Sequence, residues 1–215
     1  MRQPFRGSPD SPIENVGATL ALLVVDVQND FCPGGALGVP HGDSIIPRIN
    51  RTIRLFERRG LPILFTRDWH PRETKHFKAF GGAWPPHCIQ GTKGARFHSD
   101  LTIPDRAMIL SKGMDPEQES YSAFQALTDR GRDLESVLHE IGVGELFICG
   151  LATDYCVRAS TLDARRRGLK VHVLRDAIRG VDVKSGDSEM AIREMRAHGA
   201  AFTETRGLAK LLPPA

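Results

Sequence analysis

The chain has 215 residues, of which 40% are hydrophobic and 26% charged, a composition typical of a soluble globular domain and not of a disordered or fibrous protein. Its 29 lysines and arginines are interleaved with 26 aspartates and glutamates, apart from residues 165–167, so the formal charge of +3 predicts no nucleic-acid partner. No segment is long and apolar enough to span a membrane, and no secretory signal is recognisable, which together predict a cytoplasmic protein without a membrane partner.

Residues 1–17 carry three prolines and no apolar run, and we expect them to form a flexible extension before one domain at residues 18–215. The cysteines show neither a CxxC pair nor the density of a disulfide scaffold. Free thiols are therefore predicted at Cys32, Cys88, Cys149 and Cys156.

Short apolar runs alternate with amphipathic segments along the chain. Strands are expected at residues 20–25, 61–65, 107–110, 145–149, 171–174 and near 201–202. Helices are expected at residues 45–56, 134–141, 155–167 and 189–198, and Asp43 or Ser44 can cap the first. This alternation predicts a single α/β domain, a doubly wound, mostly parallel sheet of about six strands with helices on both faces.

Reactive side chains stand where the predicted strands end. The first strand stops at Asp26, the second leads to Asp68 and the third to Lys112. The fourth leads into Cys156 through the segment LATDY. Because the carboxyl ends of parallel strands share one edge, where ligands bind, we expect these four side chains to meet.

Cys156 is expected in the first turn of a helix, where free amides and the helix dipole stabilise a thiolate. The alternative interpretation is a buried, inert cysteine, which suits Cys149 well. A nucleophilic thiol needs a proton acceptor and nearby compensating charge, and Asp26 and Lys112 can supply them. Three such groups at one edge favour catalysis.

A second group of polar residues lies in RDWHPRETKHF and WPPHC. Asp68 and His70 are two residues apart in an extended segment, so their side chains point the same way and can bind one ion. His87 follows two stiffening prolines, and His76 is a further candidate ligand. This carboxylate and imidazole set predicts one divalent metal ion, with zinc as the first candidate and iron(II) or manganese(II) as alternatives.

These segments resemble the isochorismatase-like cysteine hydrolase superfamily, and more narrowly its nicotinamidase/pyrazinamidase branch, over residues 20–200. The matching stretches are VVDVQNDFCPGGAL, RDWHP, WPPHC, KGMDPEQESYSAF and GLATDYCV. The resemblance implies Asp26 as general base, Lys112 as the catalytic lysine and Cys156 as nucleophile. It implies a metal site made by Asp68, His70 and His87.

The resemblance also implies finer features of the site. A cis peptide is expected between Leu151 and Ala152, and the amides of Ala152 and Cys156 would form an oxyanion hole. His76 has the D-x-H-x5-H spacing of branch members with an additional histidine ligand, whereas other members use three protein ligands. Substrate contacts are expected from Phe31, Trp84, Tyr121 and Leu151.

The activity implied by the resemblance is metal-dependent hydrolysis of nicotinamide to nicotinate and ammonia, and of pyrazinamide to pyrazinoate, through a thioester. Another superfamily hydrolase, acting on a different small amide or vinyl ether, is the alternative, although such members generally lack the D-x-H metal set. A non-catalytic relative is a second alternative. A Rossmann nucleotide-binding domain is excluded because VDVQND replaces G-x-G-x-x-G. Homo-oligomers are common in the superfamily, so a dimer is expected by resemblance alone.

Overall fold

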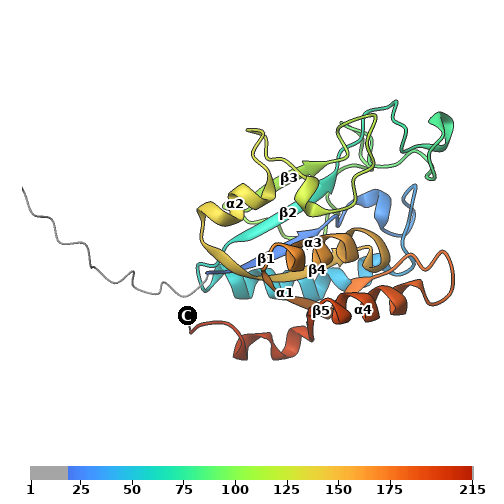
Figure 1. Ribbon diagram of the computed structural model, residues 1–215. Helices are drawn as coiled ribbons and strands as arrows, with labels where there is room; N and C mark the ends of the chain where they lie inside the picture. The colour runs from blue at the N-terminus through green and yellow to red at the C-terminus, as the bar shows by residue number, and fades with distance from the viewer. Residues whose placement is uncertain (1–18, 215) are drawn as a thin grey trace, which may run out of the picture.

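The computed structural model describes residues 19–214, which fold around one β-sheet. Its six strands run parallel in the order β3-β2-β1-β4-β5-β6 (Figure 1). The strands are β1 Thr19–Val25, β2 Ile63–Asp68, β3 Met108–Lys112, β4 Val143–Leu151, β5 Lys170–Arg179 and β6 Ala201–Thr203. This confirms the predicted α/β class with a six-stranded parallel sheet, while the extension predicted at residues 1–17 lies outside the described residues.

Helices cover both faces of the sheet because its central strands are apolar on both sides. In β1, Leu23 packs in one core cluster with three helices, and Leu22 packs in the other cluster with a single helix. The helices of the first cluster are α2 Leu134–Glu140, α3 Arg158–Arg166 and α4 Asp187–Ala197, and that of the second is α1 Ile46–Glu57. Burial on both faces explains the uninterrupted apolar run of β1. None of the helices within residues 19–214 has the length and apolar character needed to cross a membrane.

The predicted cap of the first helix is wrong. Asp43 and Ser44 lie inside a 3-10 turn, Gly42–Ile45, and α1 begins only at Ile46 without a side-chain cap. His41 precedes this turn with a φ of 56°. The chain therefore enters α1 through a tight turn instead of a capping side chain.

The carboxyl ends of the strands form the edge that holds the predicted site. Asp68 and Lys112 end neighbouring strands and are direct partners in the register of β2 and β3. Asp26 follows the last residue of β1, and β4, on the other side of β1, leads into the turn that contains Cys156. The segment between β2 and β3, drawn in green, leaves the sheet at the same edge (Figure 1).

Candidate active site and metal centre

Lys112 lies at the centre of the site, with its side chain fully buried. Its Nζ is 2.9 Å from Oδ2 of Asp26 and 3.4 Å from Sγ of Cys156, and it donates a short hydrogen bond to Oδ1 of Asp68. Burial acts to lower the pKa of Lys112, but the two carboxylates raise it well above its usual value. The ammonium group therefore stays charged and joins the three other strand-end residues.

Asp26 is held in a strained backbone conformation directly after β1. Its φ is 49°, a left-handed value that is uncommon for residues other than glycine and typical of functional sites. Its Oδ1 accepts a hydrogen bond of 2.8 Å from the hydroxyl of Thr66 in the neighbouring strand. Burial raises the pKa of Asp26, and the ammonium of Lys112 offsets part of this effect. A carboxylate with a raised pKa is suited to accept a proton.

Cys156 lies in a turn that differs from the predicted helix. The turn Thr153–Val157 is π-helical, and α3 begins only after it. The carbonyl of Ala152 accepts hydrogen bonds from the amides of Tyr155 and Val157, each 3.1 Å long. The peptide bond between Leu151 and Ala152 is cis, as expected.

The thiol of Cys156 lies against the two carboxylates. Its Sγ and one carboxylate oxygen from each of Asp26 and Asp68 lie within 4.8 Å of one another. Burial raises the pKa of Cys156 well above its usual value, and the ammonium of Lys112 acts in the opposite direction. The thiol is therefore protonated at rest and needs a base before it can attack. All four cysteines are free, as predicted.

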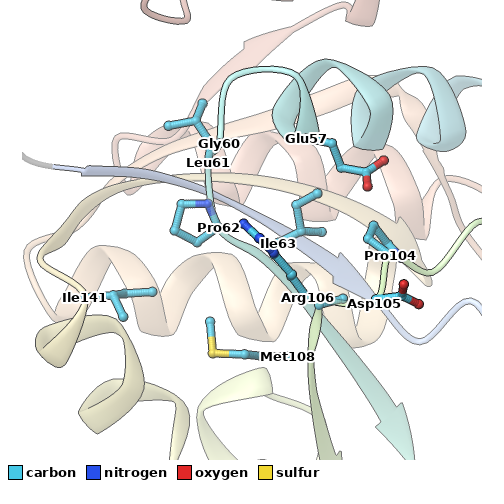
Figure 2. Close-up of a pocket in the computed structure, with 11 residues that line it drawn as sticks. Glu57, Gly60, Leu61, Pro62, Ile63, Pro104, Asp105, Arg106, Met108 and Ile141 are labelled. Carbon is cyan, nitrogen blue, oxygen red and sulfur yellow. The ribbon is translucent and has the colours of Figure 1, made fainter. Parts of the chain in front are cut away.

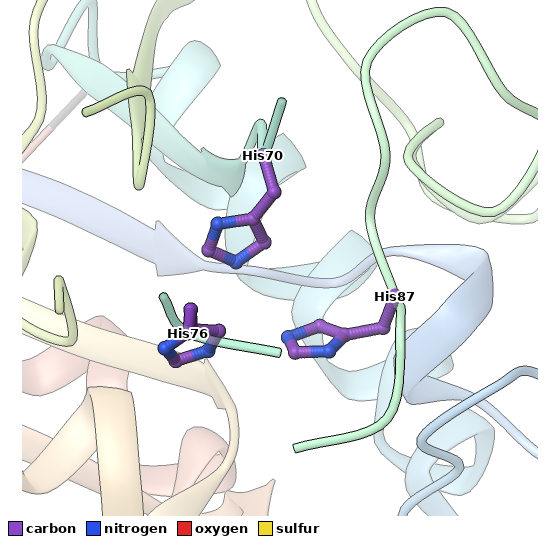
Figure 3. Close-up of side chains that lie close together, drawn as sticks. All are labelled: His70, His76 and His87. Atoms are coloured by element: carbon purple, nitrogen blue, oxygen red, sulfur yellow. The ribbon is translucent and has the colours of Figure 1, made fainter. Parts of the chain in front are cut away.

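Three histidines form a second cluster beside the first. Ring nitrogens of His70, His76 and His87 lie within 4.8 Å of one another, and Figure 3 shows the three rings turned toward a shared centre. Asp68 borders this cluster, since its Oδ2 is 3.6 Å from Nε2 of His70 and 4.0 Å from Nε2 of His87. The structure thus brings together the three predicted ligands and the additional candidate, His76.

Backbone carbonyls orient two of these rings. Nδ1 of His70 is 3.0 Å from the carbonyl oxygen of Gly113, and Nδ1 of His87 is 2.8 Å from that of Pro85. Each Nδ1 must carry the proton in such a contact, which leaves Nε2 with a free lone pair. Gly113 has a φ of 68°, and a Cβ atom there would lie 2.4 Å from the ring of His70. Only glycine fits so close to this ring.

The histidine cluster has the properties that a divalent ion requires. Nε2 of His70 and Nδ1 of His76 are buried without a hydrogen-bond partner. Burial, aided by the neighbouring histidines, lowers the pKa of His76 to about 4, and burial also lowers the pKa of His87. Neutral imidazoles beside an ionised carboxylate are the forms that bind metal. Burial acts to raise the pKa of Asp68, but the ammonium of Lys112, together with His70 and His87, holds it well below its usual range.

A small aromatic pocket opens onto both clusters. Trp84 lies edge-on to Tyr155 with ring centroids 5.0 Å apart, and its Nε1 donates a 2.9 Å hydrogen bond to the hydroxyl of Tyr121. The lining comprises Phe31, Leu37, Asp68, His76, Trp84, His87, Tyr121, Ala152, Tyr155, Cys156 and Val181. Three of the four predicted substrate contacts therefore line this pocket.

Leu151 is the exception. Its side chain is fully buried in the core cluster on the α1 side, near Gly42, and does not line the pocket. Tyr155 and Val181 line it instead and were not predicted. Tyr155 directly precedes the thiol, so its position in the sequence could have indicated it. Val181 comes from a loop after β5, and no local signal indicated it.

A larger hollow lies at the amino ends of β2 and β3, on the opposite edge of the sheet (Figure 2). Its charged residues are Glu57, Asp105 and Arg106, and the rest of its lining is apolar or glycine. None of the predicted site residues takes part in it. Within residues 19–214, the predicted catalytic and metal-binding side chains lie at the other edge of the sheet, where the strands have their carboxyl ends.

Comparison with known proteins agrees with this arrangement. A family model of the isochorismatase domain matches residues 20–207. The chain belongs to the isochorismatase family. The nicotinamidase of Escherichia coli K12 is 41% identical over 201 residues, covering 85% of this chain and 93% of that protein. The nicotinamidase/pyrazinamidase of Mycobacterium tuberculosis is 38% identical over 181 residues, covering 82% and 94%.

Solved structures give the same result for this member of the isochorismatase family. The pyrazinamidase of Pyrococcus horikoshii in complex with zinc has a TM-score of 0.80 and 47% identity, covering 86% of this chain and 98% of that chain. A protein of L. infantum in complex with nicotinate has a TM-score of 0.79 and 34% identity, covering 88% and 94%. The resemblance to the nicotinamidase/pyrazinamidase branch is thereby confirmed.

Proposed function

We propose that the chain is a metal-dependent cysteine amidohydrolase that converts nicotinamide to nicotinate and ammonia, and pyrazinamide to pyrazinoate. The observation that carries this proposal is the buried thiol of Cys156, with the ammonium of Lys112 3.4 Å away and the carboxylate of Asp26 beside both. Relatives named nicotinamidase, together with the nicotinate and zinc complexes of two similar structures, support the substrate and the ion.

The chain's own residues account for each step. Asp26 accepts the proton of the Cys156 thiol, and the thiolate attacks the carboxamide carbon to form a tetrahedral intermediate. The amides of Ala152 and Cys156 donate hydrogen bonds to the oxyanion of this intermediate, while Lys112 keeps the buried carboxylates compensated. Asp26 returns the proton to the departing ammonia, which leaves a thioester on Cys156. The same carboxylate then takes a proton from water, and the water oxygen attacks the thioester. The C–S bond breaks, Asp26 returns the proton to the Cys156 thiolate, and the nicotinic acid leaves and loses its proton to solvent as nicotinate.

The metal-binding residues are Asp68, His70, His76 and His87. A bound divalent ion would supply a Lewis acid that can bind a ring nitrogen of the substrate. We propose zinc for this site, because one carboxylate and three imidazoles match its ligand preferences, with iron(II) or manganese(II) as the other candidates. The buried, unpartnered Nε2 of His70 supports an ion at this place.

The pocket walls fit a flat heteroaromatic ring. Phe31, Trp84 and Tyr155 present aromatic surface, while the polar atoms of His76 and His87 lie on the metal side. A flat substrate whose ring nitrogen faces the histidines would bring its carboxamide toward Cys156. Such positioning is worth several powers of ten in rate, because it converts a bimolecular encounter into an oriented one.

Ammonia release from a panel of substrates tests this function. Nicotinamide and pyrazinamide should be hydrolysed by the purified protein, and benzamide, which lacks a ring nitrogen, should be a poor substrate. Isochorismate represents the alternative of a vinyl-ether hydrolase and is expected to be inert. Turnover of isochorismate without ammonia release from nicotinamide would refute the proposal. Elemental analysis of the same preparation identifies the ion.

A further inference from the structure

We propose that Asp30 is a positioning residue for the metal centre and acts through the backbone of Cys88 to hold His70 and His87 in one arrangement. Asp30 does not line the pocket and is not one of the four metal-binding candidates. The inference rests on the metal-dependent function proposed above. It assigns to this carboxylate a role in metal affinity that its position outside the histidine cluster does not suggest.

The carboxylate of Asp30 joins two loops. Its Oδ2 accepts a 2.7 Å hydrogen bond from the amide of Cys88, and its Oδ1 accepts one of 3.2 Å from the amide of Ala36. The backbone of Asp30 is itself fixed, since its amide donates to the carbonyl of Gly94 and its carbonyl accepts from the amide of Leu37. A residue held on both backbone groups presents its carboxylate at a defined place.

Cys88 connects this carboxylate to two metal ligands. It follows His87 directly in the chain, and its carbonyl accepts a 3.0 Å hydrogen bond from the amide of His70. One residue, Cys88, therefore links the two histidines, and its amide donates its hydrogen bond to Asp30. A shift of the Cys88 backbone would move both imidazoles together.

The conformation of Cys88 needs such a contact. Its φ is 46°, a left-handed value that costs conformational free energy in a residue other than glycine and persists only where surrounding contacts enforce it. Hydrogen bonds from backbone amides to an ionised carboxylate are among the stronger ones available. The Asp30 contact is therefore well suited to enforce the turn.

The surroundings of Asp30 are shaped around its carboxylate. A Cβ atom at position 94 would lie 2.1 Å from Oδ2 of Asp30, so only glycine lets the backbone approach this closely. The preceding residue, Asn29, provides a matched control. Its side chain donates to the carbonyl of Lys93 in the same segment and makes no hydrogen bond to Cys88 or to the three histidines of the cluster in the described structure.

Metal titration of the full chain tests the proposal. The parent and the variants Asp30→Asn, Asp30→Ala and Asn29→Ala are stripped with a chelator and titrated with Co²⁺, whose visible absorption reports ligand geometry. Zn²⁺ affinity is then measured by competition with a chromophoric chelator. Loss of an outer-shell partner typically weakens metal affinity by about 10- to 100-fold. We expect this loss, with an altered Co²⁺ spectrum, for Asp30→Ala. A smaller loss is expected for Asp30→Asn, whose amide oxygen can still accept from Cys88.

The outcomes separate this proposal from the one it rests on. Thermal unfolding of the metal-free proteins identifies folded variants, and the nearly isosteric Asp30→Asn carries the test if Asp30→Ala does not fold. Asn29→Ala should keep the parent's affinity and spectrum. If the Asp30 variants match the parent in both measurements, or if Asn29→Ala loses as much, the positioning role is overturned while the metal centre stands. If the parent itself binds neither ion, the proposed metal-dependent function fails.

Discussion

The thiol cluster of Asp26, Lys112 and Cys156 and the histidine cluster of His70, His76 and His87 differ in how their polar atoms are satisfied. In the thiol cluster Oδ2 of Asp26 is also buried without a hydrogen-bond partner, but it lies 2.9 Å from the ammonium of Lys112, which supplies an opposite charge. In the histidine cluster two buried ring nitrogens have no partner. Asp68 contacts both clusters.

This difference indicates that the histidine cluster, and not the thiol cluster, needs a cation from outside the chain. Buried polar atoms without partners cost free energy, and no side chain of the cluster supplies a partner to these two ring nitrogens. A cation removes that cost in the histidine cluster. The thiol cluster already contains its cation, Lys112.

The largest expected effect comes from removing the ammonium group of Lys112. Lys112→Met leaves two buried carboxylates facing each other, which should cost about 3–5 kcal/mol of unfolding free energy and abolish ammonia release. Urea unfolding and an ammonia assay measure the two effects. The double variant Lys112→Met/Asp26→Asn should recover part of the stability but no activity. An unchanged unfolding free energy in Lys112→Met would show that the ammonium does not compensate this site.

Removing the proposed metal ion should have the next largest effect. Outer-shell changes alone cost about 10- to 100-fold, so chelation should lower the rate of nicotinamide hydrolysis by at least about 100-fold. A divalent ion should restore it and stabilise the protein by about 4 kcal/mol at a free concentration a thousand times the Kd.

A matched pair of histidine variants tests whether the metal ion binds at the histidine cluster. His76→Ala should weaken metal binding, while His98→Ala, outside the cluster, should leave it unchanged. Activity indifferent to the chelator would remove the ion from the mechanism.

The smallest expected effect is a pH dependence of the metal-free protein. The pKa of His76 is about 4 in the fold against an ordinary 6.5, so between these values the unfolded chain binds more protons than the folded one. Stability should therefore fall as the pH is lowered from about 6.5 to 4, by on the order of 1–2 kcal/mol. Thermal unfolding of the metal-free parent and of His76→Ala measures this. An equal decline in both proteins would contradict the assignment to His76.

The strand-end residues were predictable from sequence because parallel strands end at one edge. Asp68 and Lys112 end adjacent strands. The two-residue spacing of Asp68 and His70 predicted that both side chains point toward one candidate metal site. Leu151 does not line the pocket with the other predicted contacts, because its side chain at the end of β4 lies in the core on the α1 side. Val181 was missed because it reaches the pocket only through the folding of a distant loop.

Some features of the site could not be predicted from the periodicity of apolar residues or from the spacing of polar residues in the sequence. The π-helical turn before α3 replaces the first turn of a predicted helix, and the apolar pattern of such a short segment is the same for both. The left-handed conformations of Asp26 and Cys88 depend on contacts with other segments. These are the places where tertiary contacts override local preference.

Trapping the acyl-enzyme tests the central claim most directly. The protein is mixed with nicotinamide, quenched in acid within its first turnovers and analysed by intact mass and peptide mapping. We predict one nicotinoyl group attached to Cys156, and neither the adduct nor ammonia release in Cys156→Ala that retains its bound metal. Ammonia release by Cys156→Ala, or an adduct on another residue, would contradict the account.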